Sequence, residues 1–255
     1  MKCTDWRVLV TGASSGIGRA TAELFAKEGA KLLLMARSED KLAALSKEFN
    51  ERYGVEVHYV SVDVQQRSAV EAALTGLPEA WQAIDVLVNN AGLALGLEKL
   101  HEGNVDQWEQ MIDTNVKGVL YISRHVVGKM LARNKGHIIN IGSVSAHQVY
   151  SGGVVYCATK FALRAITDGI KMDVHGTPIR TTSIDPGMVE TQFSVTRFSG
   201  DQAKADSVYQ GLTPLRPEDI ADAVVYAATR PAHVDVREML IMPTAQTAAH
   251  LTHRE

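Results

Sequence analysis

Tyr156 and Lys160 are the residues of this sequence whose types and spacing point most directly to chemistry. Four positions separate them, so on a helix they share one face. A phenol with a pKa of about 10 is a poor base at neutral pH, but an adjacent ammonium favours the phenolate. Ser143, upstream of both, offers a hydroxyl to a substrate oxygen. We expect these three side chains to form a proton-transfer site with Tyr156 as general acid and base.

A glycine-rich turn with the sequence TGASSGIG occupies residues 11–18, directly after the apolar run VLV. Its glycines would let the backbone approach a pyrophosphate, whose charge the N-terminus of the next helix would favour. The spacing is G-x-x-x-G-x-G, and for this segment alone a tight turn without a ligand is the alternative. The residues expected at the dinucleotide here are Gly12, Ser14, Ser15, Gly16, Ile17 and Gly18.

The choice of dinucleotide depends on the end of the second apolar run, which reads Leu34-Met35-Ala36-Arg37-Ser38. Many NAD sites carry an acid near this point for the ribose 2′-hydroxyl, whereas a guanidinium holds a 2′-phosphate. Arg37 and Ser38 therefore predict NADP(H) rather than NAD(H). The alternative is a solvated Arg37 at the start of a charged helix.

Two further strand ends supply expected nucleotide contacts. Asp63 and Val64 close the third apolar run, where a carboxylate accepts a hydrogen bond from an adenine amino group. Asn90 lies in the segment NNAG, whose small residues leave room for the adenosine ribose. Each of these alone is an ordinary turn signal.

Alternating apolar runs and helical periods must position these residues. The apolar runs that predict strands are residues 7–10, 31–35, 55–62, 85–88, 137–141, 179–184 and 237–242. The periodic segments that predict helices are residues 17–28, 39–53, 68–74, 105–133, 156–174 and 217–228. This order predicts one α/β domain over residues 1–255, a doubly wound Rossmann-type fold with a seven-stranded parallel sheet flanked by helices. Its ligand crevice should lie beyond the carboxyl ends of the strands.

Composition limits the classes of function. The chain has 255 residues and a net charge of −3, without the basic runs of a nucleic-acid-binding protein. No apolar run reaches the roughly 20 residues that span a bilayer, and the first residues lack a signal-peptide pattern. With Cys3 and Cys157 as the only cysteines, we expect no disulfide framework and a cytoplasmic location. The histidine spacings predict no metal site.

In their order and spacing these motifs resemble the short-chain dehydrogenase/reductase family over nearly the whole chain. The resemblance implies a catalytic tetrad of Asn115, Ser143, Tyr156 and Lys160, in which Asn115 kinks its helix and holds a water that relays protons to Lys160. It also implies hydride transfer at the nicotinamide, with Tyr156 and Lys160 near its ribose. Further nicotinamide contacts are implied for Pro186, Gly187 and Thr191.

Longer stretches such as GHIINIGSVSAHQVYSGGVVYCATK resemble one branch of the family. That branch contains NADP-dependent 3-hydroxy acid dehydrogenases and serine or allo-threonine dehydrogenases, and it implies 3-hydroxypropionate and semialdehydes as further substrates. Related enzymes reduce sulfoacetaldehyde. Ser38 departs from the branch, which often has a second Arg at this position, and the loop around Thr191 is one residue shorter.

The polar segment 188–216 follows the sixth predicted strand and is expected to form a lid over the substrate. Within it, the guanidinium of Arg197 would hold a carboxylate or sulfonate, while a solvated lid residue is the equal alternative. His147, Gln148 and Tyr150 follow Ser143 and are expected to line the opposite wall of the substrate pocket, with His147 as a polar pocket or surface residue rather than a base. The expected substrate contacts are Ser143, His147, Tyr156 and Arg197.

The helical segments 105–133 and 156–174 carry more apolar positions than one core-facing stripe requires. Together with the resemblance, which implies a homotetramer built on these helices, this pattern favours a homotetramer. The alternative is deep burial within a monomer.

The leading functional hypothesis is an NADP-dependent dehydrogenase of small 3-hydroxy acids or a reductase of the matching semialdehydes. A sulfoacetaldehyde reductase and a 3-oxoacyl-carrier-protein reductase are alternatives. The second is disfavoured because the end MLIMPTAQTAA lacks the Gly-Gly usual in that branch. A non-catalytic NADP(H)-binding regulator would not need the proton-transfer residues.

Overall fold

A seven-stranded parallel sheet forms the centre of the molecule, which we describe from a computed structural model covering residues 3–255. The strand order is β3-β2-β1-β4-β5-β6-β7, with the reversal between β1 and β4 that is typical of a doubly wound sheet. The strands are β1 (Arg7–Thr11), β2 (Lys31–Ala36), β3 (Val57–Ser61), β4 (Val86–Asn89), β5 (His137–Ile141), β6 (Arg180–Pro186) and β7 (Glu238–Ile241).

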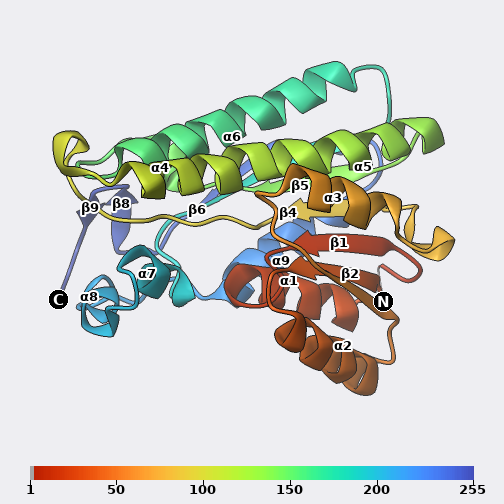
Figure 1. Ribbon diagram of the computed structural model, residues 1–255, viewed down its shortest axis with the longest axis horizontal. Helices are drawn as coiled ribbons and strands as arrows, with labels where there is room; N and C mark the ends of the chain where they lie inside the picture. Colours follow the sequence, from red (N-terminus) through yellow and green to blue (C-terminus); the bar gives the residue numbers. More distant parts are fainter. Residues whose placement is uncertain (1–2) are drawn as a thin grey trace.

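Helices cover both faces of this sheet (Figure 1). On one face lie α1 (Gly16–Lys27), α2 (Glu39–Tyr53) and α9 (Pro217–Ala228). On the other lie α3 (Arg67–Thr75), α4 (Val105–Ile112), α5 (Val119–Arg133) and α6 (Val154–Asp173). The expected doubly wound Rossmann-type fold is confirmed.

Successive side chains along a strand point to opposite faces of the sheet and pack into two separate hydrophobic cores. Val8 and Val10 of β1 pack with Phe25 of α1 on one face, whereas Leu9 packs with Ile122 of α5 on the other. Because both faces are covered, β1, β2 and β4 are apolar over most of their length. The sheet is therefore rigid, and its carboxyl ends form a fixed edge for a site.

The predicted continuous helix over residues 105–133 is interrupted. A π-helical turn, Asp113–Gly118, separates α4 from α5. Within it Asn115 is buried, and its side chain bonds to backbone outside the helix. A π-turn widens the helix locally, which places Asn115 where the helical period alone would not.

Two features were not expected from the sequence. The segment 188–216 contains two short helices, α7 (Gln192–Arg197) and α8 (Gln202–Ser207). Residues beyond β7 form a small antiparallel hairpin of β8 (Gln246–Ala248) and β9 (Leu251–Thr252). Both elements are too short and polar to show a period, and both lie near the carboxyl edge of the sheet (Figure 1). Within residues 3–255, no helix combines the length and the apolar character needed to cross a bilayer.

Candidate active site

A cleft of about 590 Å³ runs along the carboxyl edge of the sheet, between the glycine-rich turn and the α7–α8 segment. It brings together residues from the ends of β1 to β6, as a doubly wound fold predicts. The expected nucleotide residues that line it are Gly12, Ser14, Ser15, Gly16, Ile17, Arg37, Ser38, Asp63, Val64, Asn90, Tyr156, Lys160, Pro186, Gly187 and Thr191. The expected substrate residues that line it are Ser143, Tyr156 and Arg197.

The glycine-rich turn has the geometry of a phosphate cradle. Gly12 and Gly16 have φ values of +64° and +52°, which favour glycine. Gly18 lies behind the cleft, where a Cβ would meet the Gly12 carbonyl oxygen at 2.4 Å, so glycine lets α1 approach the turn. Helix α1 begins at Gly16, and the Ser15 side chain makes no capping hydrogen bond. Ser15 therefore leaves the first N–H groups of α1 uncapped, and Gly16 and Ile17 line the cleft, where such groups can donate to an anion.

Asn90 connects two of the loops that line the cleft. Its Nδ2 donates to the Thr11 carbonyl oxygen at 2.8 Å, and its backbone N–H donates to Thr11 Oγ1 at 3.0 Å. The end of β4 is thus tied to the start of the glycine-rich turn. Asn90 shapes the cleft as well as lining it.

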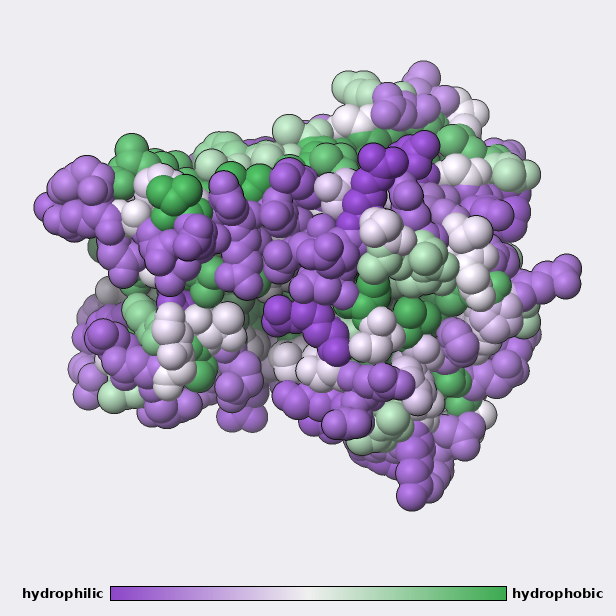
Figure 2. All heavy atoms as spheres, in the orientation of Figure 1, coloured by the Kyte–Doolittle hydropathy of each residue, from purple (hydrophilic) through white to green (hydrophobic). Residues whose placement is uncertain are grey.

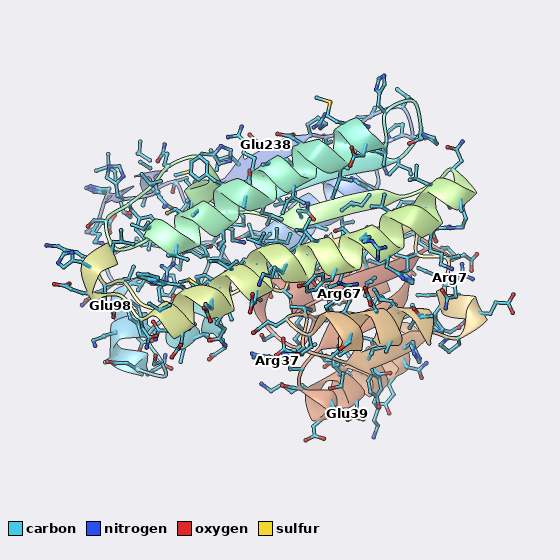
Figure 3. All side chains as sticks on the ribbon, turned by 45° about the horizontal axis from the view of Figure 1, so that its top comes forward. Arg7, Arg37, Glu39, Arg67, Glu98 and Glu238 are labelled. Atoms are coloured by element: carbon cyan, nitrogen blue, oxygen red, sulfur yellow. The ribbon has the colours of Figure 1, made fainter. Side chains whose placement is uncertain are left out.

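The far end of the cleft carries a cation. Arg37 and Ser38 follow β2, and Figure 3 shows Arg37 near Glu39 at the start of α2. Ser38 is the N-cap residue of α2, but its side chain makes no capping hydrogen bond. Asp63, on the neighbouring strand end, accepts a hydrogen bond from the Gln65 backbone at 3.0 Å. A positive guanidinium and a hydroxyl at this point suit a phosphate group.

Ser143, Tyr156 and Lys160 meet at the centre of the cleft. Ser143 and Tyr156 line the same part of the cleft, where Ser143 lowers the Tyr156 pKa, and Lys160 Nζ lies 5.8 Å from the centre of the Tyr156 ring. Lys160 Nζ also donates to the Ile141 carbonyl oxygen at 2.9 Å. The sheet edge and one face of α6 therefore bring together the three residues that the sequence singles out.

Burial dominates the titration of this cluster. It lowers the pKa of Lys160 to about 8, against the opposing effect of the Asp185 carboxylate. It also raises the pKa of Tyr156, which Arg197 and Ser143 lower. Arg197 is thus a cation beside the phenol that the spacing of Tyr156 and Lys160 did not predict.

Asn115 lies behind this cluster. Its Oδ1 accepts from the Leu93 N–H at 2.9 Å, and its Nδ2 donates to the Leu93 carbonyl oxygen at 2.8 Å and to Thr159 Oγ1 at 3.0 Å. Thr159 precedes Lys160 on α6. Asn115 thus joins the π-turn to the loop after β4 and to the helix that carries Tyr156 and Lys160.

Arg197 enters the cleft from α7. Its guanidinium carbon lies 5.0 Å from the Tyr156 ring centre and 5.3 Å from that of Phe193. Its Nη2 donates to the Tyr150 hydroxyl at 2.8 Å, while its buried Nε has no hydrogen-bond partner among the described residues. A buried donor without a partner is costly in the free protein and is a ready anion site.

His147 does not line the cleft. Its Nε2 lies 2.7 Å from Oδ2 of the buried Asp185 on β6, a carboxylate that needs a hydrogen-bond donor. Of the three residues expected on this wall, Tyr150 lines the cleft, whereas His147 and Gln148 do not.

Sequence reasoning missed Gln246 on β8. Its Oε1 accepts from the Met188 N–H at 2.8 Å, beside Gly187, and it lines the cleft. A glutamine near the C-terminus, far from β6 in the sequence, gives no local signal of this contact. Asp185 was also not predicted, because an acid at a strand end before a Pro-Gly turn gives no signal of a buried hydrogen-bonded carboxylate.

The doubly wound fold, the phosphate cradle and the Ser143–Tyr156–Lys160 cluster define a class: an oxidoreductase that uses a dinucleotide. The chain belongs to the short chain dehydrogenase family, whose family model matches residues 7–202.

Individual relatives within the family are similar to this chain over nearly its whole length. An NADP-dependent 3-hydroxy acid dehydrogenase, YdfG, from Salmonella typhi is 47% identical over 249 residues, covering 97% of this chain and 99% of the relative. Serine 3-dehydrogenase from Rhizobium radiobacter is 41% identical over 242 residues, covering 95% of each chain. The closed form of a serine dehydrogenase complexed with NADP+ superposes with a TM-score of 0.91 at 44% identity, covering 98% of this chain and 100% of that one.

Proposed function

We propose that this protein transfers a hydride between NADP(H) and a small 3-hydroxy acid or the corresponding semialdehyde, with Tyr156 as general acid and base. The observation that carries this proposal is the meeting of Tyr156, Ser143 and Lys160 in the cleft, with Arg197 above the phenol ring. The 3-hydroxy acid and serine dehydrogenases among its relatives support the substrate class.

The residues that line the cleft suit both phosphate groups of the nucleotide, the pyrophosphate and the 2′-phosphate. The N–H groups at the start of α1, beside the open backbone of Gly12 and Gly16, would hold the pyrophosphate. Arg37 and Ser38 would hold the 2′-phosphate that distinguishes NADP(H). Relatives with NADP in their names support this choice.

The bound nicotinamide supplies or accepts the hydride, and the protein handles the proton. The Tyr156 hydroxyl gives a proton to the developing alkoxide during reduction and takes it back during oxidation. Ser143 Oγ orients the substrate oxygen, and the Lys160 ammonium favours the phenolate when the proton leaves. Asn115, by fixing the π-turn against α6, would hold the proton path behind Lys160.

Arg197 gives the reaction its preference for acids. Its guanidinium lines the cleft beside the Tyr156 ring, so a carboxylate held by it would place a hydroxyl two carbons away near the phenol. Phe193, 5.7 Å from Tyr156 between ring centres, removes water from the same space. A sulfonate has the same charge, which keeps a sulfoacetaldehyde-type substrate as a second candidate.

We assign segment 188–216 as the substrate lid. Helix α7 carries Phe193 and Arg197 over the cleft, and the Gly96 N–H donates to the Arg197 carbonyl oxygen at 3.1 Å across the opening. Tyr209 fastens the base of the lid, since its hydroxyl donates to the Val189 carbonyl oxygen at 2.8 Å.

Assembly is proposed on the face formed by α4, α5 and α6. Figure 2 shows hydrophobic side chains gathered along these helices. Ile112, Leu120, Phe161 and Met172 are exposed there, with 77% of Met172 accessible. Burying such a face between copies fits the expected homotetramer. Sedimentation of a stable 27.7 kDa particle would contradict it.

A substrate panel tests the activity. NADPH oxidation and NADP+ reduction are followed with C3–C5 hydroxy acids, serine, isethionate and neutral alcohols, each with the matching semialdehyde or carbonyl where available. We expect turnover of 3-hydroxy acids that depends on Tyr156. Turnover of an acyl-carrier-protein thioester without any hydroxy acid would support the 3-oxoacyl reductase instead, and nucleotide binding without turnover would support a regulator.

A further inference from the structure

A chain of polar side chains lies behind the catalytic cluster, on the side away from the cleft. Its centre is Asp185, which is fully buried at the end of β6. Asp185 Oδ1 accepts from Ser183 Oγ at 2.7 Å, and Oδ2 lies 2.7 Å from His147 Nε2. A buried carboxylate requires such donors, and here both of its oxygens have one.

The third member of the chain fixes the tautomer of His147. Arg164 Nη1 lies 3.1 Å from His147 Nδ1. A guanidinium has donors only, so Nδ1 must accept and the ring proton must lie on Nε2. His147 therefore donates to Asp185 through its Nε2 proton.

The charged groups around Asp185 come from two elements, α6 and β7. Lys160 and Arg164 are the cations, both on α6, and the Asp185 charge acts on Lys160. Glu238 on β7, labelled in Figure 3, is the remaining anion, and its Oε2 lies 3.3 Å from Arg164 Nε. His147, Asp185 and Glu238 have ligand atoms within 4.8 Å of one another, but Arg164 already supplies the cation that pairs with this group.

Asp185 also touches the backbone that carries Ser143. A Cβ on Gly142 would lie 1.8 Å from Asp185 Oδ1, so the carboxylate rests directly on the Gly142 backbone. The Gly142 N–H donates to the Ile184 carbonyl oxygen at 2.7 Å. The carboxylate thus lies against the segment that leads into Ser143.

We propose that Asp185 is a positioning residue that, held by His147 and Ser183, supplies the counter-charge of the Lys160 ammonium. The proposal rests on the proposed function only in taking Lys160 to act in the reaction. Lys160 is buried, its Nζ donates to a neutral carbonyl oxygen, and the Tyr156 ring centre lies 5.8 Å away. Lys160 Nζ donates to the carbonyl oxygen of Ile141, and the Asp185 carboxylate rests on the next residue, Gly142. The carboxylate therefore lies close to the ammonium, and its charge raises the Lys160 pKa against the effect of burial.

The test measures Lys160 itself. In protein labelled with 13Cε-lysine, the Lys160 signal is assigned by its loss in Lys160→Met and is titrated by NMR. Asp185→Asn removes the charge and keeps the shape. We expect the Lys160 pKa to fall by about one unit from its value near 8, as loss of a nearby opposite charge predicts. The alkaline limb of the kcat profile should move down by the same amount.

Two further variants separate positioning from general damage. His147→Gln keeps an N–H donor for Asp185, whereas His147→Leu does not, so only Leu should lower the Lys160 pKa. Asp168→Asn removes an acid from the exposed side of α6, where the side chain is 63% accessible, and should leave that pKa unchanged.

An unchanged Lys160 titration in a folded Asp185→Asn protein overturns the proposal. If that variant does not fold, equal Lys160 titrations in His147→Gln and His147→Leu overturn it instead. The NMR readout uses no substrate, so a protein that turns over no hydroxy acid would refute the proposed function and still report on Asp185.

Discussion

The guanidinium carbon of Arg197 lies 5.0 Å from the centre of the Tyr156 ring. One residue comes from the lid helix α7 and the other from α6, so the contact closes the cleft over its most reactive group. Arg197 also has two roles in this position. The cation that would bind the substrate acid is the cation that opposes the burial effect on the Tyr156 pKa.

Arg197→Ala should raise KM for 3-hydroxy acids roughly tenfold to a hundredfold, because a hydrogen bond to a charged group contributes about 1.5–3 kcal/mol. Neutral alcohols, which lack the carboxylate, should lose much less. Steady-state kinetics with both substrate types measure the difference. Lys204→Ala, which removes an exposed cation of segment 188–216 that does not line the cleft, is the control. Equal losses for acids and neutral alcohols would rule out carboxylate recognition.

The same substitution should shift the pH dependence of oxidation. Arg197 lowers the pKa of Tyr156, so its removal raises that pKa and leaves less phenolate at a given pH. The rise of kcat with pH should therefore move to more alkaline values in Arg197→Ala and stay near wild type in Arg197→Lys. Rate profiles with a neutral alcohol measure this without the binding defect. If the pH profile did not move in Arg197→Ala, Arg197 would not be the group that lowers the Tyr156 pKa.

Tyr156→Phe should lower kcat by roughly 10²–10⁴, the usual contribution of a positioned acid or base. The phenyl ring keeps its contacts with Phe193 and Arg197, so NADPH affinity should change little. Fluorescence titration of NADPH measures binding, and absorbance measures turnover. Tyr226→Phe, with the side chain on the surface, is the matched control. Substantial activity in Tyr156→Phe would exclude Tyr156 as the proton donor.

Arg37→Asp should exchange the cofactor preference from NADP(H) toward NAD(H). The new carboxylate repels a 2′-phosphate and accepts a hydrogen bond from a ribose 2′-hydroxyl. The ratio of kcat/KM for the two cofactors measures the exchange. Arg67→Asp makes the same charge change on the exposed side of α3 and should leave the ratio unchanged. If both variants changed it equally, net charge and not a specific contact would explain the preference.

Local patterns predicted the frame of the site. Val8 and Leu9 point to opposite faces of a covered sheet, and the glycines of residues 11–18 mark where β1 turns into α1. Tyr156 and Lys160 share a helix face because their spacing requires it. Each of these relationships lies within one element or one turn, where periodicity and backbone freedom decide.

Contacts between distant segments were not predictable in this way. His147 turned out to bind Asp185, 38 positions away, because a buried carboxylate needs a donor. Gln246 binds the Met188 backbone through a hairpin too short to show a strand pattern. Such partners depend on which unsatisfied groups the fold leaves at the sheet edge, and single-sequence patterns do not contain that information.

The fully buried His137 on β5 should make the protein sensitive to acid. Its Nε2 lies 2.8 Å from Thr182 Oγ1, whose own proton goes to the Val236 carbonyl oxygen at 2.6 Å, so Nε2 carries the ring proton. The buried Nδ1 has no hydrogen-bond partner among the described residues. Protonating it would bury a charge near Arg180 and Lys171, and burial holds the pKa well below 6.5.

The sign of the effect follows from this lowered pKa. Below pH 6.5 the unfolded chain binds a proton at His137 that the folded protein does not, so the stability present above that pH is lost as the pH falls. One such group contributes a slope of up to about 1.4 kcal/mol per pH unit. Urea unfolding of wild type and His137→Val between pH 7 and pH 5 should show a shallower decline in the variant. The His137→Val variant should still lose some stability as the pH falls, because burial also lowers the pKa values of His58 and His125. Replacing the exposed His101 with Asn should not change the slope, and parallel declines in all three proteins would show that His137 is not the group that titrates.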